Sequence, residues 1–124
     1  MEQAQILTYG ADGPLAARLD ELAQRQGLWL RSVQHVRTCR SLLRRGGPAV
    51  LVVVLGRDLV HELTLVEEVS RTLPDTAVIV IGDTDHPALE ALAWDVGAHC
   101  VLAPPQPVES LPEIVMGFVS ARER

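Results

Sequence analysis

Residues 49–55 form an unbroken apolar run, Ala-Val-Leu-Val-Val-Val-Leu, with Gly-Gly-Pro before it and glycine after it. A run of this length, rich in β-branched residues, predicts a strand that is buried on both faces. Burial on both faces requires helices above and below a largely parallel sheet. In such sheets, ligands and reacting groups lie at the carboxyl ends of the strands. Here that end consists of residues 54–56, Val-Leu-Gly, which offer no reactive side chain.

The chain has 124 residues, of which 48% are hydrophobic and 22% are charged, as is typical of one globular domain. No apolar stretch reaches the roughly 18 residues of a membrane helix, and no basic leader precedes the first expected strand. We therefore expect a cytoplasmic protein. All eleven basic residues are arginine, so chemistry that needs a lysine ammonium group has no candidate. Cys39 and Cys100 are expected to be free, buried thiols.

Segments typical of strands and helices alternate five times along the chain. Strands are expected at residues 5–9, 28–33, 49–55, 77–81 and 99–103. In the third helix, the inward stripe is expected to be Leu59, Leu63, Val66, Val69 and Leu73. In the fourth, expected from Asp85 to Val96, it is Leu89, Leu92, Ala93 and Val96. This order predicts an α/β flavodoxin-like (βα)5 fold, a three-layer sandwich around a parallel sheet of strand order 2-1-3-4-5.

Four segments resemble the receiver domain of bacterial two-component response regulators. They are Pro48–Val54 in the third expected strand, Leu73–Ile81 leading into and through the fourth, Gly97-Ala98 before the fifth, and Pro104-Pro105 after it. The resemblance extends over essentially the whole chain. The length predicts a single domain over residues 1–124. The polar end at residues 120–124, Ser-Ala-Arg-Glu-Arg, is suited to a continuing linker, so we expect the domain to be the N-terminal part of a longer regulator, to which an effector domain could be attached.

The functional positions that this resemblance implies are all occupied by residues of other types. The phosphoacceptor aspartate falls on Val54, and the acidic pair that holds magnesium falls on Gly10 and Ala11. The hydroxyl residue falls on Gly82 and the lysine on Pro104. Phosphoryl transfer depends on a positioned nucleophile and on neutralisation of charge by a cation and a positive group. The resemblance therefore implies a pseudo-receiver, with no catalytic residue and no bound metal.

Three aspartates leave a second interpretation open. Asp12, Asp58 and Asp83 follow the first, third and fourth expected strands, so their side chains could converge on a cation or a small ligand. Asp12 and Asp58 are equally suited to cap the helices that follow them, and this structural role is the preferred interpretation. The four histidines lie in different segments, without the paired spacing of a zinc helix. We therefore expect no cofactor and no enzymatic activity.

Charge is distributed unevenly along the chain. Residues 22–57 contain seven arginines and no acidic residue, although the net charge of the whole chain is −5. The simplest interpretation is a solvated basic face. The alternative is a docking surface for an acidic partner, formed by Arg37, Arg40, Arg44 and Arg45. The acidic total and an aromatic content of 3% argue against direct binding of nucleic acid.

The fourth expected helix carries a large apolar residue outside its inward stripe. The 3.6-residue period turns Trp94 and Ala91 outward, and Met116 on the last helix is displaced similarly. Val101 lies on the strand between the two helices, at the position of the family's aromatic switch residue. In receivers, the face formed by these three elements commonly dimerises or binds partners. The resemblance thus implies a homodimer or protein-partner interface around Trp94, unless the indole lies flat in a surface groove.

Two functions from different classes remain. The preferred one is a phosphorylation-independent regulatory and protein–protein interaction module in signal transduction or transcription regulation. The alternative is a flavodoxin-like domain that binds a small ligand or a metal through Asp12, Asp58 and Asp83.

Overall fold

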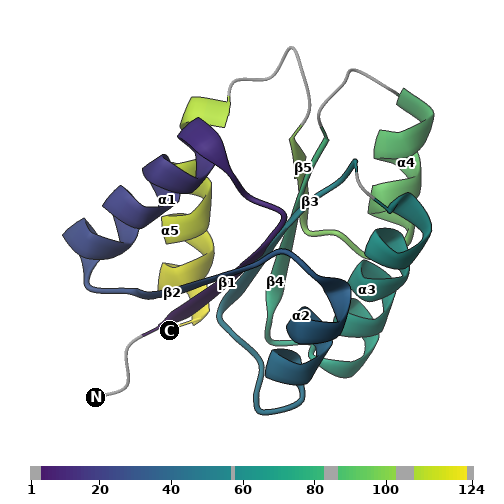
Figure 1. Ribbon diagram of the computed structural model, residues 1–124, viewed down its shortest axis with the longest axis horizontal. Helices are drawn as coiled ribbons and strands as arrows, with labels where there is room; N and C mark the ends of the chain where they lie inside the picture. Colours follow the sequence, from purple (N-terminus) through teal and green to yellow (C-terminus); the bar gives the residue numbers. More distant parts are fainter. Residues whose placement is uncertain (1–3, 57, 83–86, 103–107, 123–124) are drawn as a thin grey trace.

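The protein is described by a computed structural model that covers residues 4–56, 58–82, 87–102 and 108–122 (Figure 1). In chain order the elements are β1 (Gln5–Tyr9), α1 (Gly13–Gln26), β2 (Trp29–Val33), α2 (Val36–Leu43), β3 (Val50–Val54), α3 (Leu59–Thr72), β4 (Ala77–Ile81), α4 (Pro87–Asp95), β5 (Cys100–Leu102), the 3₁₀ turn η1 (Val108–Ser110) and α5 (Leu111–Arg122). Within these ranges no helix combines the length and the apolarity needed to cross a bilayer.

The five strands form one parallel sheet in the order β2-β1-β3-β4-β5, which confirms the predicted topology. β1 lies between β2 and β3, and its last residue, Tyr9, is paired with Val33 on one side and Val53 on the other. Val54, at the end of β3, is paired with Ile81 at the end of β4. The carboxyl ends of these strands are therefore level, and they form a single edge of the sheet.

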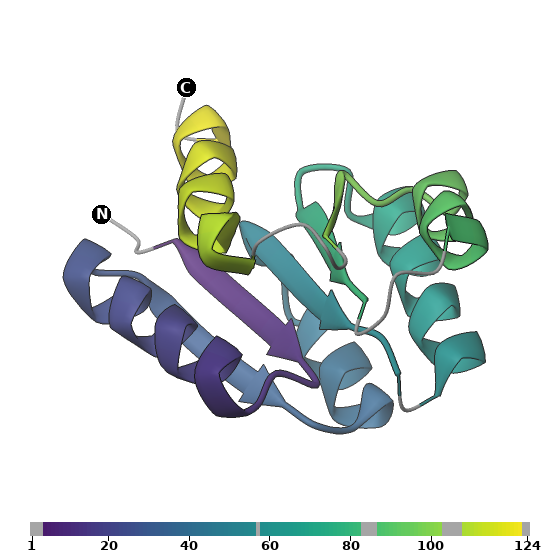
Figure 2. The same cartoon turned by 90° about the horizontal axis from the view of Figure 1, so that it is seen from above.

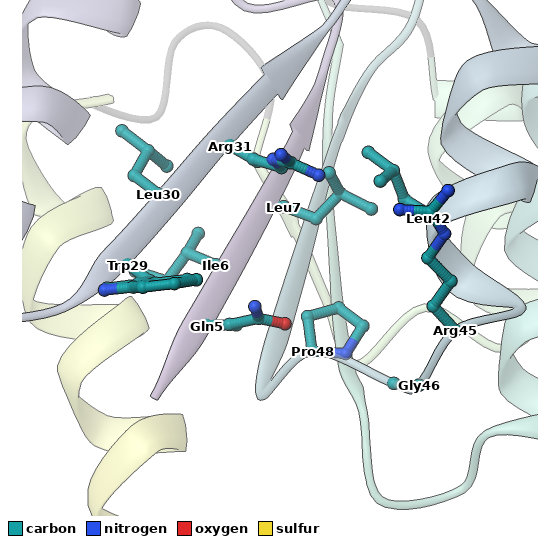
Figure 3. Close-up of a pocket in the computed structure, with 11 residues that line it drawn as sticks. Gln5, Ile6, Leu7, Trp29, Leu30, Arg31, Leu42, Arg45, Gly46 and Pro48 are labelled. Atoms are coloured by element: carbon teal, nitrogen blue, oxygen red, sulfur yellow. The ribbon is translucent and has the colours of Figure 1, made fainter. Parts of the chain in front are cut away.

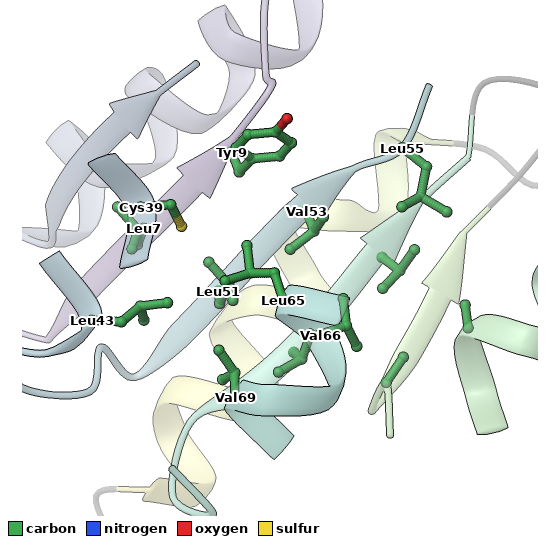
Figure 4. Close-up of a cluster of buried hydrophobic side chains, with 14 of the residues drawn as sticks. Leu7, Tyr9, Cys39, Leu43, Leu51, Val53, Leu55, Leu65, Val66 and Val69 are labelled. Atoms are coloured by element: carbon green, nitrogen blue, oxygen red, sulfur yellow. The ribbon is translucent and has the colours of Figure 1, made fainter. Parts of the chain in front are cut away.

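Helices cover both faces of the sheet, with α1 and α5 on one side and α2, α3 and α4 on the other (Figures 1 and 2). The central strands supply both cores alternately: Val50 and Val52 pack toward α1 and α5, whereas Leu51 and Val53 pack toward α2, α3 and α4 (Figure 4). All four side chains are fully buried. The apolar run in the sequence is therefore a strand buried on both faces, as its composition predicts.

The helix ends follow the expected local signals. Asp12 occupies the N-cap of α1, and Gly27 ends that helix in the left-handed conformation at φ 66°. Asp58 is the N-cap of α3 and accepts a hydrogen bond from the backbone N–H of His61. Cys39 of α2 is buried as a free thiol, and desolvation raises its pKa to about 11, while Cys100 is only half-buried.

Two leucines that were expected to face the core are exposed. Leu59 is 42% exposed because the buried stripe of α3 consists instead of Glu62, Leu65, Val66 and Val69. Leu92 is 45% exposed because fully buried Ala93 takes the centre of the inward side of α4, with Leu89 and Val96 packed beside it, so that Leu92 lies at the margin of the stripe. The expected start of the fourth helix at Asp85 lies outside the described residues.

Candidate functional site

At the carboxyl edge of the sheet, the described positions where the resemblance places phosphoryl chemistry carry no reactive side chain. Val54 ends β3 and packs partly buried against the α1 and α5 side of the core. Gly10, directly after β1, has φ +80°, and a Cβ added to it would lie 3.2 Å from the carbonyl oxygen of Val54. Ala11 is buried, and Gly82 donates its N–H to the carbonyl of Leu102 at 2.9 Å. Pro104 lies outside the described residues.

Gly10 adopts a backbone conformation that L side chains rarely take. A carboxylate at this position would therefore require strain in the backbone as well as a shift of the end of β3. The backbone of this chain thus disfavours an acidic side chain at position 10.

A buried carboxylate lies beside this edge, on α3. Glu62 has no exposed surface, and its Oε2 accepts hydrogen bonds from the Tyr9 hydroxyl at 3.0 Å and from the backbone N–H of Asp58 at 3.2 Å. Its Oε1 accepts from the backbone N–H of Gly56 at 3.1 Å. The charge is therefore stabilised by three donors. This carboxylate ties the loop between β3 and α3 to the end of β1, where Tyr9 is itself buried.

Sequence reasoning missed the pair formed by Tyr9 and Glu62. Glu62 is the only charged residue among those described that is fully buried. The burial of Glu62 is indicated in the sequence only by its spacing. Glu62 lies three residues before Leu65 and four before Val66, so it falls on the same face of α3 as these buried residues. An acidic residue on an inward face next to a strand-end tyrosine is a candidate buried hydrogen bond.

The described aspartates of the alternative interpretation lie at the starts of different helices. Asp12 is at the start of α1 and Asp58 at the start of α3, while Asp83 lies outside the described residues. The Oδ2 of Asp58 is 2.6 Å from the Nδ1 of His61, and this hydrogen bond lowers the pKa of the exposed Asp58 carboxyl. In the described ranges there is no group of three or more His, Cys, Asp or Glu side chains that could hold a metal ion.

The residues predicted for an interface differ in exposure. Trp94 is 51% exposed on α4 and Ala91 is also exposed, as the helical spacing predicts. Val101 was expected at the interface, but it is only 8% exposed and belongs to the core on the α2, α3 and α4 side. Met116 is partly buried against the opposite core. The exposed apolar surface among these residues is therefore on α4, at Trp94 and Ala91.

The four arginines of α2 and its C-terminus divide between two hollows. Arg37, Arg40 and Arg44 line a groove of about 850 Å³ between α2 and the start of α3. Arg40 is paired with Glu68 of α3, through Nε–Oε2 and Nη2–Oε1 contacts that both measure 3.2 Å. Arg45 lines a separate pocket at the opposite end of α2. The four side chains thus do not form one continuous surface.

Solved structures of receiver domains have the same architecture as this chain. The chain is similar to the receiver domain of the Francisella response regulator 1452, with 14% identity, a TM-score of 0.78, and coverage of 96% of this chain and 98% of that one. It is similar to a CheY-like receiver domain protein from Methanospirillum hungatei, with 11% identity, a TM-score of 0.82 and 98% coverage of both chains. The fold is that of a receiver domain.

The receiver fold also occurs as one part of longer proteins. NtrX from Brucella abortus, in complex with ADP, is similar at 14% identity and a TM-score of 0.77, over 98% of this chain and 27% of that one. The sequence itself matches no family model and no curated protein. At these identities the likeness concerns the fold, so the function has to be argued from the site.

Proposed function

We propose that this receiver-fold domain is a pseudo-receiver, a regulatory and interaction module of signal transduction that works without phosphorylation. The observation that carries this proposal is Val54 at the end of β3, in place of the carboxylate that would accept a phosphoryl group. A methyl-bearing side chain cannot form an acyl phosphate. The two positions after β1 that would hold the required cation are Gly10 and Ala11, which carry no carboxylate, and the next residue, Asp12, is the N-cap of α1.

The remaining acids near this edge do not replace the missing ones. Glu62 is buried and already accepts hydrogen bonds from Tyr9, Gly56 and Asp58. Asp58 is engaged with His61 at the start of α3. A carboxylate that is enclosed by donors is unsuited to attack a phosphoryl donor from solvent, because attack needs an accessible lone pair. These contacts support a structural role for the edge.

We infer that the output surface lies around α4, β5 and α5, with the exposed part of α4 at its centre. Trp94 is 51% exposed, and Ala91, three residues before it on the same side of α4, is also exposed. Tryptophan is enriched at the energetic centres of interfaces, where burying it in a pocket is worth about 2 kcal/mol or more. The occupant is a second copy or a protein partner, including an effector domain attached to the same chain. The arrangement of NtrX, whose length far exceeds one receiver, supports the last of these.

The test is an attempt to phosphorylate the protein. The chain is incubated with magnesium and acetyl phosphate, or with a histidine kinase, and its intact mass is measured, with a phosphorylatable receiver domain as a parallel control. We expect the control to gain a phosphoryl group and this chain to remain unmodified. We also expect magnesium with beryllofluoride to leave its melting temperature unchanged, since a ligand that does not bind does not stabilise. A hydroxylamine-labile phosphoryl adduct would refute the proposal.

A further inference from the structure

The opposite edge of the sheet, formed by β2, is incompletely covered. α2 spans only eight residues, Val36–Leu43, and buries Cys39 and Leu43 in the core on its side of the sheet. At the start of β2, Trp29 is 62% exposed, which makes it the more exposed of the two tryptophans. A sheet face that ends in a large exposed indole has apolar area available for a partner.

Beside this tryptophan is a pocket of about 250 Å³ (Figure 3). Leu7, Leu42 and Pro48 contribute apolar walls from β1, α2 and the segment before β3. Arg31, two residues after Trp29 on β2, and Arg45, just past the end of α2, also line it. The pocket is thus large enough for one apolar side chain and carries positive charge on two sides.

The backbone of β2 is open along its outer side. Trp29 donates its N–H to Ala4, and Val33 accepts from the N–H of Gly10, both at 2.9 Å, so the odd-numbered residues of β2 face β1. The N–H and C=O groups of Leu30 and Ser32 therefore point away from β1, because they alternate along a strand. None of the strands in the described ranges other than β1 pairs with β2. An edge of this kind can accept an additional strand.

Charge decides what kind of strand fits. Neither Arg31 nor Arg45 has an ion-pair partner among the described residues, and the sequence has no acid anywhere between residues 22 and 57. Antiparallel pairing of β2 with β2 of a second copy, centred on Arg31, would place the two guanidinium groups opposite each other, which is unfavourable. An acidic segment would instead meet complementary charge along the strand and at the pocket.

We propose that β2 and this pocket bind an extended acidic segment of a partner protein. The segment adds to the sheet beside β2 through the backbone of Leu30 and Ser32, and places an apolar side chain in the pocket against Trp29. Its carboxylates face Arg31 and Arg45. This binding site is independent of the surface around Trp94, because β2 and β5 are the two opposite edges of the sheet.

The experiment measures peptide binding by the fluorescence of Trp29 alone. The chain carries two tryptophans, so a Trp94→Phe variant leaves Trp29 as the only indole. The probe is a nine-residue peptide with glutamate, valine and glutamate at positions 3, 5 and 7, so that these three side chains share one face of the added strand, and with threonine elsewhere. It is compared with the same peptide carrying lysine in place of glutamate, and with a glutamate peptide interrupted by a central proline. We expect a blue shift with the glutamate peptide, at least tenfold weaker binding of the other two, and weaker binding as salt is raised.

Variants of the protein locate the site. Trp29→Ala and Arg31→Glu, followed with a labelled peptide by anisotropy, are expected to weaken binding at least tenfold, whereas Trp94→Ala leaves it unchanged. The matched control is Arg71→Glu, an exposed arginine on α3. Circular dichroism checks that each variant is folded. The proposal is overturned if the glutamate and lysine peptides bind alike, if Arg31→Glu binds as tightly as the original chain, or if Trp29 instead mediates self-association in sedimentation experiments.

Discussion

Large side chains are buried at the carboxyl edge of the sheet and exposed near its two lateral edges, which are formed by β2 and β5. At the carboxyl edge, where receivers carry reactive groups, Tyr9 and Glu62 are buried and their hydrogen bonds are directed into the protein. At the lateral edges, Trp29 and Trp94 are more than half exposed. The difference indicates that polar contacts near the strand ends support the fold, and it is the reason that we propose the binding surfaces at the sides.

The largest expected effect is on the buried carboxylate. Glu62→Gln keeps the shape of the side chain but replaces one carboxylate oxygen with an amide NH₂ group. If Oε2 is replaced, the donors of Tyr9 and Asp58 lose their acceptor; if Oε1 is replaced, the N–H of Gly56 loses its acceptor. At least one buried donor loses its partner, and an unsatisfied buried group costs about 1–3 kcal/mol. We expect the free energy of unfolding to fall by roughly 2–4 kcal/mol in urea titrations.

The matched control is Glu67→Gln on the same helix. Glu67 is exposed and paired with Arg71 across one turn, so its replacement should change the stability by less than about 0.5 kcal/mol. If both variants have the same stability, the carboxyl edge does not depend on Glu62, and the comparison between the edges fails.

The next effect concerns association through α4. Trp94→Ala is expected to weaken self-association, or binding of an attached effector domain, by about thirtyfold or more, corresponding to about 2 kcal/mol. Sedimentation velocity measures the first and titration with the effector domain the second. The melting temperature of the monomer should hardly change, because the side chain is largely outside the core.

Trp29→Ala serves as the control for that measurement, since it removes an equally large exposed side chain at the other lateral edge. It should leave this association unchanged. If Trp94→Ala unfolds the protein and association persists, the interface lies elsewhere. Charge reversal at Arg44 would then test the groove along α2, because Arg40 is already paired with Glu68.

A smaller effect is expected from a carboxylate at the end of β3. Val54→Asp should lower the free energy of unfolding by about 1–3 kcal/mol, since it places a charge without a partner at a half-buried position. The loss is limited by the partial exposure of this residue. The variant should also remain unmodified by acetyl phosphate, because no acidic pair holds a cation beside it. Phosphorylation of this single variant, detected by intact mass, would show that the edge retains its chemistry.

The smallest effect is expected for Tyr9→Phe. This change removes one donor from Glu62 but leaves the backbone N–H of Asp58 on the same oxygen. We expect a loss of about 1 kcal/mol. A double-mutant cycle with Glu62→Gln would show non-additive losses if the two side chains act as a pair. Additive losses would mean that the hydroxyl contributes independently of the carboxylate.

The strands and their order could be predicted from the sequence because their signals are local. The apolar run at residues 49–55 requires cover on both faces, and glycines or caps such as Gly27 and Asp58 mark the element ends. The places of Val54 and Gly10 at the carboxyl edge follow from the same alternation. These features depend on residues that are neighbours in the chain.

The features that could not be predicted depend on contacts between distant segments. The burial of Glu62 needs Tyr9, 53 residues away. Val101 is buried because of the helices that pack over β5, and its own strand does not reveal this. The pocket beside Trp29 is lined by β1, β2, α2 and the segment before β3, which are distant from one another in the chain. Each is a property of tertiary packing.

The left-handed glycine at position 10 also constrains how such a domain could change over evolutionary time. A mutation that supplies one carboxylate at Gly10 or Val54 brings strain or an unpaired charge before any second mutation can supply the cation ligand that would compensate it. Domains are stable by only about 5–15 kcal/mol, so an intermediate that loses several of these is poorly tolerated. Stepwise acquisition of phosphoryl chemistry is thus opposed by the backbone itself, whereas substitutions at the lateral edges can be selected one at a time.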